Sequence, residues 1–188
     1  LVTDNQRVKA GDLLIKIDDR DYQAVLARAN AAVQAQEAAL ANIDSERRLQ
    51  EAVIDQNKAS VSAGIAEIAR SRDDQTRYQS LSAKAAVSIQ SFEKADADYK
   101  QATANGQKAQ AGLNAAQRQL DVLATQKQKI QAVLQQTIAE RNLAQLNVAY
   151  TELRAPVDGV IGNRHARQGG YAAIGAQLLS VVPAQGLW

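Results

Sequence analysis

Helix-breaking residues are confined almost entirely to the two ends of this 188-residue chain. Both prolines, Pro156 and Pro183, lie in the C-terminal part, and residues 22–150 contain no proline and only three of the ten glycines. Proline removes a backbone hydrogen-bond donor, and glycine costs about 1 kcal/mol in a helix interior. The same segment is rich in Ala, Gln, Glu, Lys and Arg, which lose little side-chain freedom in a helix. Residues 22–150 are therefore predicted to be helical.

Composition argues against several functional classes. The chain has no cysteine, so disulfides, cysteine-based zinc sites and thiol catalysis are excluded from it. Its 22 basic residues barely exceed its 20 acidic ones, which gives little support to nucleic-acid binding. The one histidine, His165, is expected to be a solvated loop residue. We expect no catalytic, metal-binding or cofactor-binding residues.

A seven-residue repeat specifies the kind of helix. In the first part of the segment, large apolar residues recur at Leu26, Val33, Leu40, Ile54, Val61 and Ile68. After residue 91 a second series begins in a new phase, with Phe92, Tyr99, Leu113, Leu120, Leu134 and Val148, beside the alanines Ala95, Ala102, Ala109, Ala116 and Ala144. A repeat of seven kept this long is typical of a left-handed coiled coil.

Some positions of the two series are polar. Gln36, Gln50 and Asn57 could fix the register by hydrogen bonding or could lie at the wet edge of the seam. Charged residues also occupy series positions, and we expect them to extend their charged ends into water: Arg47, Lys127 and Arg141.

The phase of the repeat breaks once, between Leu81 and Ser88. Ser88 is a plausible N-cap, and Val87 and Phe92 have the spacing of a hydrophobic staple. The break predicts the turn of an antiparallel hairpin with arms of roughly 60 residues, or about 90 Å. The alternative, one continuous rod that dimerises, leaves the phase break unexplained.

The two ends of the chain have the pattern of a split sheet. Residues 8–12 are predicted to form a turn and residues 13–17 a strand, after which Asp18 caps the helix with Asp21 at position N3. The C-terminal end has predicted strands at 151–155, 160–161 and 178–182, with turns at 157–159 and 169–170. Neither end alone can bury a face, but an antiparallel hairpin brings Ile17 and Thr151 together.

Two motifs in these ends resemble those of the HlyD-type periplasmic adaptor, or membrane-fusion, proteins. The first is V-K-A-G-D-L-L running into I-D-D-R-D-Y at residues 8–22, and the second is L-R-A-P-V-D-G-V-I at residues 153–161, followed by Gly169 and Gly170. The resemblance covers the whole chain. The hairpin length and the ending of the chain are most similar to EmrA-type multidrug efflux adaptors.

The resemblance implies an α+β fold, in which a long antiparallel two-helix coiled-coil hairpin is inserted between the two halves of a lipoyl-like (biotinyl-lipoyl) β-sandwich. The implied divisions are the first half of that domain at 1–21, the hairpin at 22–150 with its tip near 82–90, the second half at 151–183, and the start of a β-barrel domain at 184–188. A true lipoyl or biotinyl carrier offers a lysine at the turn joining its halves. Asp18, Asp19, Arg20 and Asp21 stand there instead, so no cofactor is expected.

The tip carries the most specific implied site. Arg77, Leu81 and Ser88 match the R-x3-L-x6-S motif by which family members engage the helical end of a TolC-like outer-membrane channel. An arginine offers five donors to partner carbonyls or carboxylates, and a leucine at a turn offers apolar contact. In the alternative interpretation Arg77 is a solvated charge, Leu81 closes the last layer of the coil and Ser88 is only a cap.

The function implied is that of a non-enzymatic periplasmic adaptor in a tripartite efflux pump that exports drugs or toxic compounds. Its implied partners are the TolC-like channel, an inner-membrane transporter, for which the major-facilitator type is favoured over the ABC and RND types, and further copies of itself in a trimer or hexamer. The chain is expected to be a periplasmic piece of an inner-membrane-anchored protein of a Gram-negative bacterium. The alternatives are an adaptor of type I protein secretion, a purely structural coiled coil, and a carrier domain.

Overall fold

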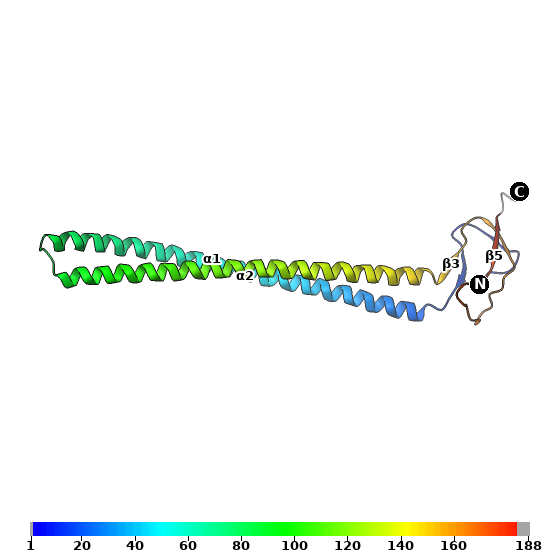
Figure 1. The fold of residues 1–188 in the computed structure, drawn as a ribbon. Helices are drawn as coiled ribbons and strands as arrows, with labels where there is room; N and C mark the ends of the chain where they lie inside the picture. Colours follow the sequence, from blue (N-terminus) through cyan, green and yellow to red (C-terminus); the bar gives the residue numbers. More distant parts are fainter. Residues whose placement is uncertain (1, 184–188) are drawn as a thin grey trace. The chain divides into compact units, whose positions relative to one another are not determined.

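The structure, a computed structural model, describes residues 2–183, so the expected β-barrel start at 184–188 lies outside the described residues. Two long helices follow two strands and precede three more (Figure 1). The elements are β1 (Arg7–Val8), β2 (Leu13–Lys16), α1 (Arg20–Ala83), α2 (Ile89–Ala149), β3 (Glu152–Arg154), β4 (Gly159–Gly162) and β5 (Ser180–Pro183). The chain forms two compact units: a base unit, made of residues up to 36 and from 133 onward, and a tip unit of residues 37–132.

The base unit holds two small antiparallel sheets. One has the strand order β1-β4-β5 and the other pairs β2 with β3. Both sheets contribute to one apolar core, whose buried residues are Val2, Val8, Leu14, Ile15, Ala155 and Ile161. Strands from both ends of the chain thus bury a face that neither end could bury alone, which is the split sheet expected from the sequence.

Three strands lie within one residue of the predicted bounds, and two differ by more. The predicted strand at 178–182 begins at Ser180, because the carbonyl oxygen of Leu178 accepts hydrogen bonds from the backbone amides of His165 and Ala166, both at 3.0 Å. Strand β1 was not predicted at all. It is only two residues long, and its pairing with β4 defines it.

The two sequence motifs of the base unit bind each other directly. The carboxylate of Asp158 accepts a hydrogen bond from the amide of Ala10 at 2.7 Å, and the carbonyl of Ala155 accepts one from the amide of Gly11 at 2.8 Å. Gly159 is required by close approach, since a Cβ atom there would lie 2.3 Å from the carbonyl oxygen of Val182 on β5. The motif residues therefore join the two halves of the domain.

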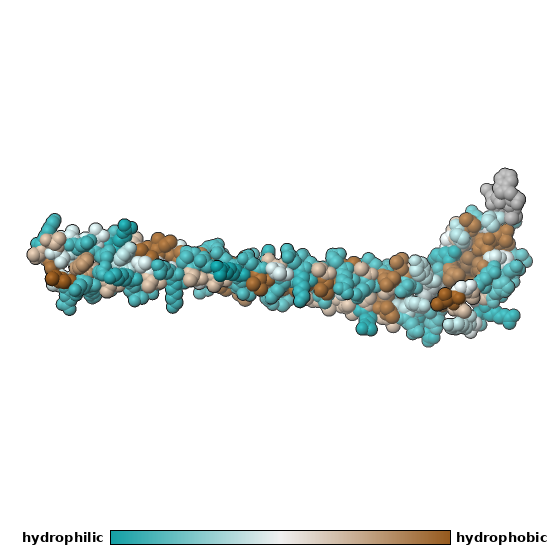
Figure 2. All heavy atoms as spheres, viewed as in Figure 1, coloured by the Kyte–Doolittle hydropathy of each residue, from teal (hydrophilic) through white to brown (hydrophobic). Residues whose placement is uncertain are grey.

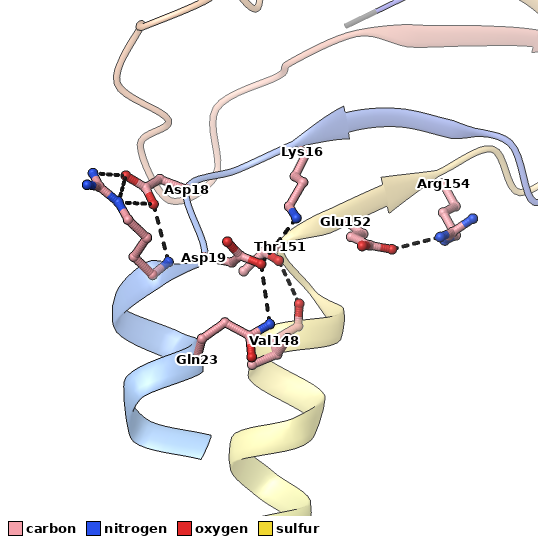
Figure 3. Close-up of polar contacts among 9 residues, drawn as sticks. Lys16, Asp18, Asp19, Gln23, Val148, Thr151, Glu152 and Arg154 are labelled. Atoms are coloured by element: carbon pink, nitrogen blue, oxygen red, sulfur yellow. Dashed lines mark hydrogen bonds and ion pairs between the residues drawn. The ribbon is translucent and has the colours of Figure 1, made fainter. Parts of the chain in front are cut away.

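The hairpin leaves and re-enters the sheets at one place, shown in Figure 3. The amide of Ile17 donates to the carbonyl of Thr151 at 2.8 Å, and the hydroxyl of buried Thr151 donates to the carbonyl of Val148 at 2.6 Å. The expected meeting of Ile17 and Thr151 is therefore present.

The start of α1 corrects the predicted cap. The carbonyl of Asp19 accepts the first helical bond, from the amide of Gln23 at 2.8 Å, so Asp19 occupies the N-cap position and Asp21 is N2. The carboxylate of Asp18, one residue earlier, accepts from the amide of Arg20 at 3.2 Å. Hydrogen bonds from Arg20 lower the pKa of Asp18 to about 2.

The tip unit is built on the predicted seam. Its buried or half-buried residues include those members of the two seven-residue series that lie within 37–132, and Ile43, Ile54 and Leu123 are among the most buried. Two glycines allow a close approach of the helices: a Cβ atom on Gly64 would lie 3.3 Å from the Cα atom of Gly106. The tip unit is thus an antiparallel two-helix hairpin, and the fold class expected from the sequence is confirmed (Figure 1).

Polar seam residues differ in what they do. Gln50 donates across the seam to the carbonyl of Ala116 at 2.8 Å and so fixes the register, whereas Asn57 donates to Val53 of its own helix. Lys127 does not simply extend into water, because its ammonium group pairs with Asp44 of the other helix at 2.7 Å. That hydrogen bond lowers the pKa of Asp44.

The outward surface of the helices is mainly hydrophilic. On the face seen in Figure 2, hydrophilic residues cover most of the helices and hydrophobic ones form small separate patches. Within residues 2–183, neither helix has an apolar stretch long enough to cross a membrane.

Candidate functional site at the hairpin tip

The turn between the helices has the hydrogen bonds of a Schellman motif. Helix α1 ends at Ala83 and α2 begins at Ile89. The amide of Ala86 donates to the carbonyl of Leu81 at 2.9 Å, and the amide of Ala85 donates to that of Ser82 at 2.9 Å. Ala85 occupies the left-handed position, with φ +55°, where glycine is usual.

Ser88 caps α2, as the sequence predicts. Its hydroxyl oxygen accepts from the amide of Ser91 at 3.1 Å, and the two serine hydroxyls lie 2.8 Å apart. Ser88 remains exposed. Its side chain therefore holds the first turn of α2 while staying accessible to a partner.

Arg77 lies exposed near the end of α1, with 65% of its side chain accessible. Its guanidinium group pairs with Asp74, one helical turn earlier, at 3.0 Å. Asp74 also faces Arg70 at 3.4 Å, and Arg70 donates twice to Glu67, which lowers the pKa of Glu67. An ion-pair ladder thus runs along α1 toward the tip: Glu67, Arg70, Asp74 and Arg77.

Two apolar residues flank the turn. Leu81 is half-buried, so part of its side chain remains accessible. Ile89 is 71% exposed. Ile89 was missed at the sequence level, although it could have been found as a large apolar residue that directly follows the N-cap and belongs to neither seven-residue series.

An open groove of about 370 Å³ lies between the two helices close to the turn. Its lining is mostly polar and comes from both helices: Arg70, Ser71, Asp74, Tyr78, Ser91, Lys94, Ala95 and Asp98. We call it the tip groove. It shares Asp74 with the ion pair of Arg77, so the candidate docking residues adjoin it.

The base unit contains the positions where a carrier lysine or a histidine site would be sought. Where a carrier domain would present its lysine, Arg20 binds Asp18 and Lys16 pairs with Asp19 at 3.3 Å. His165 is exposed in the loop after β4, and its amide donates to Leu178. Within residues 2–183, no three His, Asp or Glu side chains are grouped as metal ligands would be.

Curated proteins are similar in sequence to this chain. The chain is 34% identical over 189 residues to the colistin resistance protein EmrA of Acinetobacter baumannii, a match that covers 100% of this chain and 53% of that protein. It is 32% identical over 188 residues to the fatty acid resistance protein FarA of Neisseria gonorrhoeae, covering 98% of this chain and 45% of that protein. The chain therefore spans about half the length of these curated relatives.

The fold is also found among solved structures. MacA from Actinobacillus actinomycetemcomitans superimposes with a TM-score of 0.52 at 21% identity, over 97% of this chain and 44% of that one. Residues 1–184 match the family described as "RND MFP, barrel-sandwich hybrid domain". The chain accordingly belongs to the membrane fusion protein family, as the motifs at its two ends predict.

Proposed function

We propose that this chain is the hairpin-bearing part of a periplasmic adaptor subunit in a tripartite efflux pump. In this proposal the adaptor bridges an inner-membrane transporter and a TolC-like outer-membrane channel, and it exports drugs or other toxic compounds. Arg77, Leu81 and Ser88 form the channel-docking tip. The adaptor performs no catalysis; it supplies reach and contact between the two membrane partners.

The observation that carries the proposal is the construction of the tip. A capped turn holds Leu81 partly exposed, and one helical turn earlier Arg77 presents a largely accessible guanidinium group. The names of the relatives, which refer to resistance to colistin and to fatty acids, support export of toxic compounds.

The remaining parts of the proposal follow from family membership. We propose that residues 1–21 and 151–183 are the two half-domains and that residues 22–150 are the hairpin. The transporter is of the major-facilitator type, with ABC and RND transporters as the alternatives, and the adaptor assembles as a trimer or hexamer. It is anchored in the inner membrane of a Gram-negative bacterium.

The tip assignment is tested by export in cells that produce the full-length protein with its transporter and a TolC-type channel. Arg77→Asp and Leu81→Ser should each lower drug resistance, because they reverse the charge and remove the apolar contact at the tip. Gln101→Ser, an exposed change on α2 away from the tip, is the control. Normal resistance with both tip variants, at a normal protein level, would reject the assignment.

The second candidate is a purely structural coiled coil. Such a protein would need no split sheet domain. In this chain the two end motifs are joined by hydrogen bonds from the Ala10 amide to Asp158 at 2.7 Å and from the Gly11 amide to the Ala155 carbonyl at 2.8 Å, and so they build one. An adaptor of type I protein secretion has the same parts and differs in the cargo that is exported. If the tip variants lost protein secretion while drug resistance stayed unchanged, that alternative would be favoured.

A further inference from the structure

The docking residues continue down one face of α1. Arg70, Asp74, Arg77 and Leu81 follow one another at spacings of four, three and four residues, which places them on the same side of a helix. The ion pairs of Asp74 with Arg70 and with Arg77 agree with this placement. The face that carries the two tip residues is therefore also a wall of the tip groove.

Small seam residues create the groove. Ser71 and Ala95, which form part of its lining, are 3% and 6% exposed. Where larger residues occupy the seam they fill the space between the flanking side chains, but a serine and an alanine leave a hollow of about 370 Å³. The opposite wall comes from α2 and includes Lys94 and Asp98.

Arg77 is turned toward this groove. Its guanidinium group binds a carboxylate three residues earlier in the chain, so the side chain points back along α1, away from the turn. A partner that meets only the extreme end of the hairpin would not reach this guanidinium group in the orientation observed. A partner that also lies along the flank would.

The two walls differ in how their charges are satisfied. On α1, Arg70, Asp74 and Arg77 all take part in ion pairs. Within residues 2–183, Lys94 and Asp98 on α2 enter no ion pair at all. The charge of Asp98 acts across the groove on Arg70, whose pKa it helps to raise, but no ion pair holds either residue. One cation and one anion, four residues apart on α2, are thus available to a partner.

We propose that the tip groove is part of the channel-docking surface, an inference that rests on the proposed function. The occupant is a helical segment of the outer-membrane channel that brings an acidic side chain to Lys94 and a basic side chain to Asp98. Docking then extends from Leu81 down one flank of the hairpin, and these two charges select for a channel of complementary charge pattern.

Charge reversal at the groove tests this. The affinity of the purified full-length protein for a purified TolC-type channel is measured for Lys94→Glu and Asp98→Lys. Arg72→Glu is the matched control, because residue 72 lies about 200° around the helix from both 70 and 74 and does not line the groove. Leu81→Ser is measured in parallel as the tip variant.

We expect Lys94→Glu and Asp98→Lys each to weaken binding about tenfold at low salt and less at high salt, and Arg72→Glu to change it less than about twofold. If both groove variants behave like Arg72→Glu while Leu81→Ser abolishes binding, the groove inference is wrong and the tip assignment stands. If Leu81→Ser also binds normally, the proposed function fails as well.

Further measurements check that a loss of binding comes from the groove itself. Lys94→Gln, a milder change, should give a smaller loss in the same direction, and circular dichroism must show unchanged helicity for every variant. A photo-crosslinker at position 94 should join the adaptor to the channel. Crosslinking only to a second copy of the adaptor would overturn the inference in favour of contact between copies.

Discussion

Replacing Ala85 by glycine should stabilise the hairpin turn. Ala85 has φ +55° at the position of the Schellman motif that normally holds glycine. An L-residue costs about 1–2 kcal/mol in this conformation, and glycine loses about 0.5–1 kcal/mol more backbone entropy on folding. Ala85→Gly is therefore expected to stabilise the turn by about 0.5–1 kcal/mol.

The matched control lies two residues away. Ala83 is the last residue of α1, where the backbone is helical, so Ala83→Gly should destabilise the same turn by about 0.5–1 kcal/mol. The same chemical change thus has opposite signs at the two positions, which removes any general effect of adding a glycine near the tip.

Hydrogen exchange of the Ala86 amide measures this directly, because that amide donates to Leu81 across the turn. Its exchange should slow by about twofold to fivefold in Ala85→Gly and quicken by a similar factor in Ala83→Gly. Faster exchange in Ala85→Gly would refute the assignment of the left-handed position and of the motif built on it.

Three other predictions concern the base unit and the charged contacts. Gly159→Ala should lower the free energy of unfolding by about 2–3 kcal/mol in urea denaturation, because its Cβ atom would meet the backbone of β5. Gly162→Ala should cost less than about 1 kcal/mol, because its Cβ atom would meet side chains alone, the hydroxyl of Ser180 and, at an ordinary contact distance, a methyl group of Val182. Equal losses would contradict the close approach at Gly159. Asp158→Ala should lower the free energy of unfolding by about 1 kcal/mol and quicken hydrogen exchange of the Ala10 amide. Asp158→Asn, which keeps an acceptor oxygen, should lower it by less. An unchanged exchange rate of the Ala10 amide in the alanine variant would exclude the hydrogen bond between the motifs. Ion-pair and hydrogen-bond partners lower the pKa values of four carboxyl groups: Asp18, Asp44, Glu67 and Asp96. The stabilisation that these carboxylates give the folded state is therefore present above about pH 4 and is lost as the pH falls toward 2. Thermal unfolding followed between about pH 7 and 2 should show this decline, and the decline should be shallower in Lys127→Met, where Asp44 has lost its partner.

The larger features of the fold could be predicted because each depends on residues close together in the sequence. The stretch between Tyr22 and Tyr150, which has no proline and only three glycines, predicted the helices, and the phase break before Ser88 predicted the turn. Two errors arose where a tertiary contact decides. Strand β1 exists only through its pairing with β4, and the carbonyl of Leu178 is used by a loop rather than by a strand.

The candidate site could be predicted only in part, for the same reason. Arg77, Leu81 and Ser88 are candidates because their spacing matches the motif of the family that the sequence resembles, but the tip groove depends on which residues of α2 lie level with Asp74. That register is set by the turn and by cross-helix contacts such as the bond from Gln50 to Ala116. The pair of Lys127 with Asp44 escaped prediction because the two residues are 83 positions apart.

The proposal that the tip meets the channel is tested most directly by site-specific photo-crosslinking. The full-length protein would carry the crosslinker at position 81 in one sample and at position 101, an exposed site on α2 away from the tip, in another, each mixed with a purified TolC-type channel. We predict a crosslink to the channel from position 81 and none from position 101. A crosslink from neither position, or from both equally, would contradict docking through the tip.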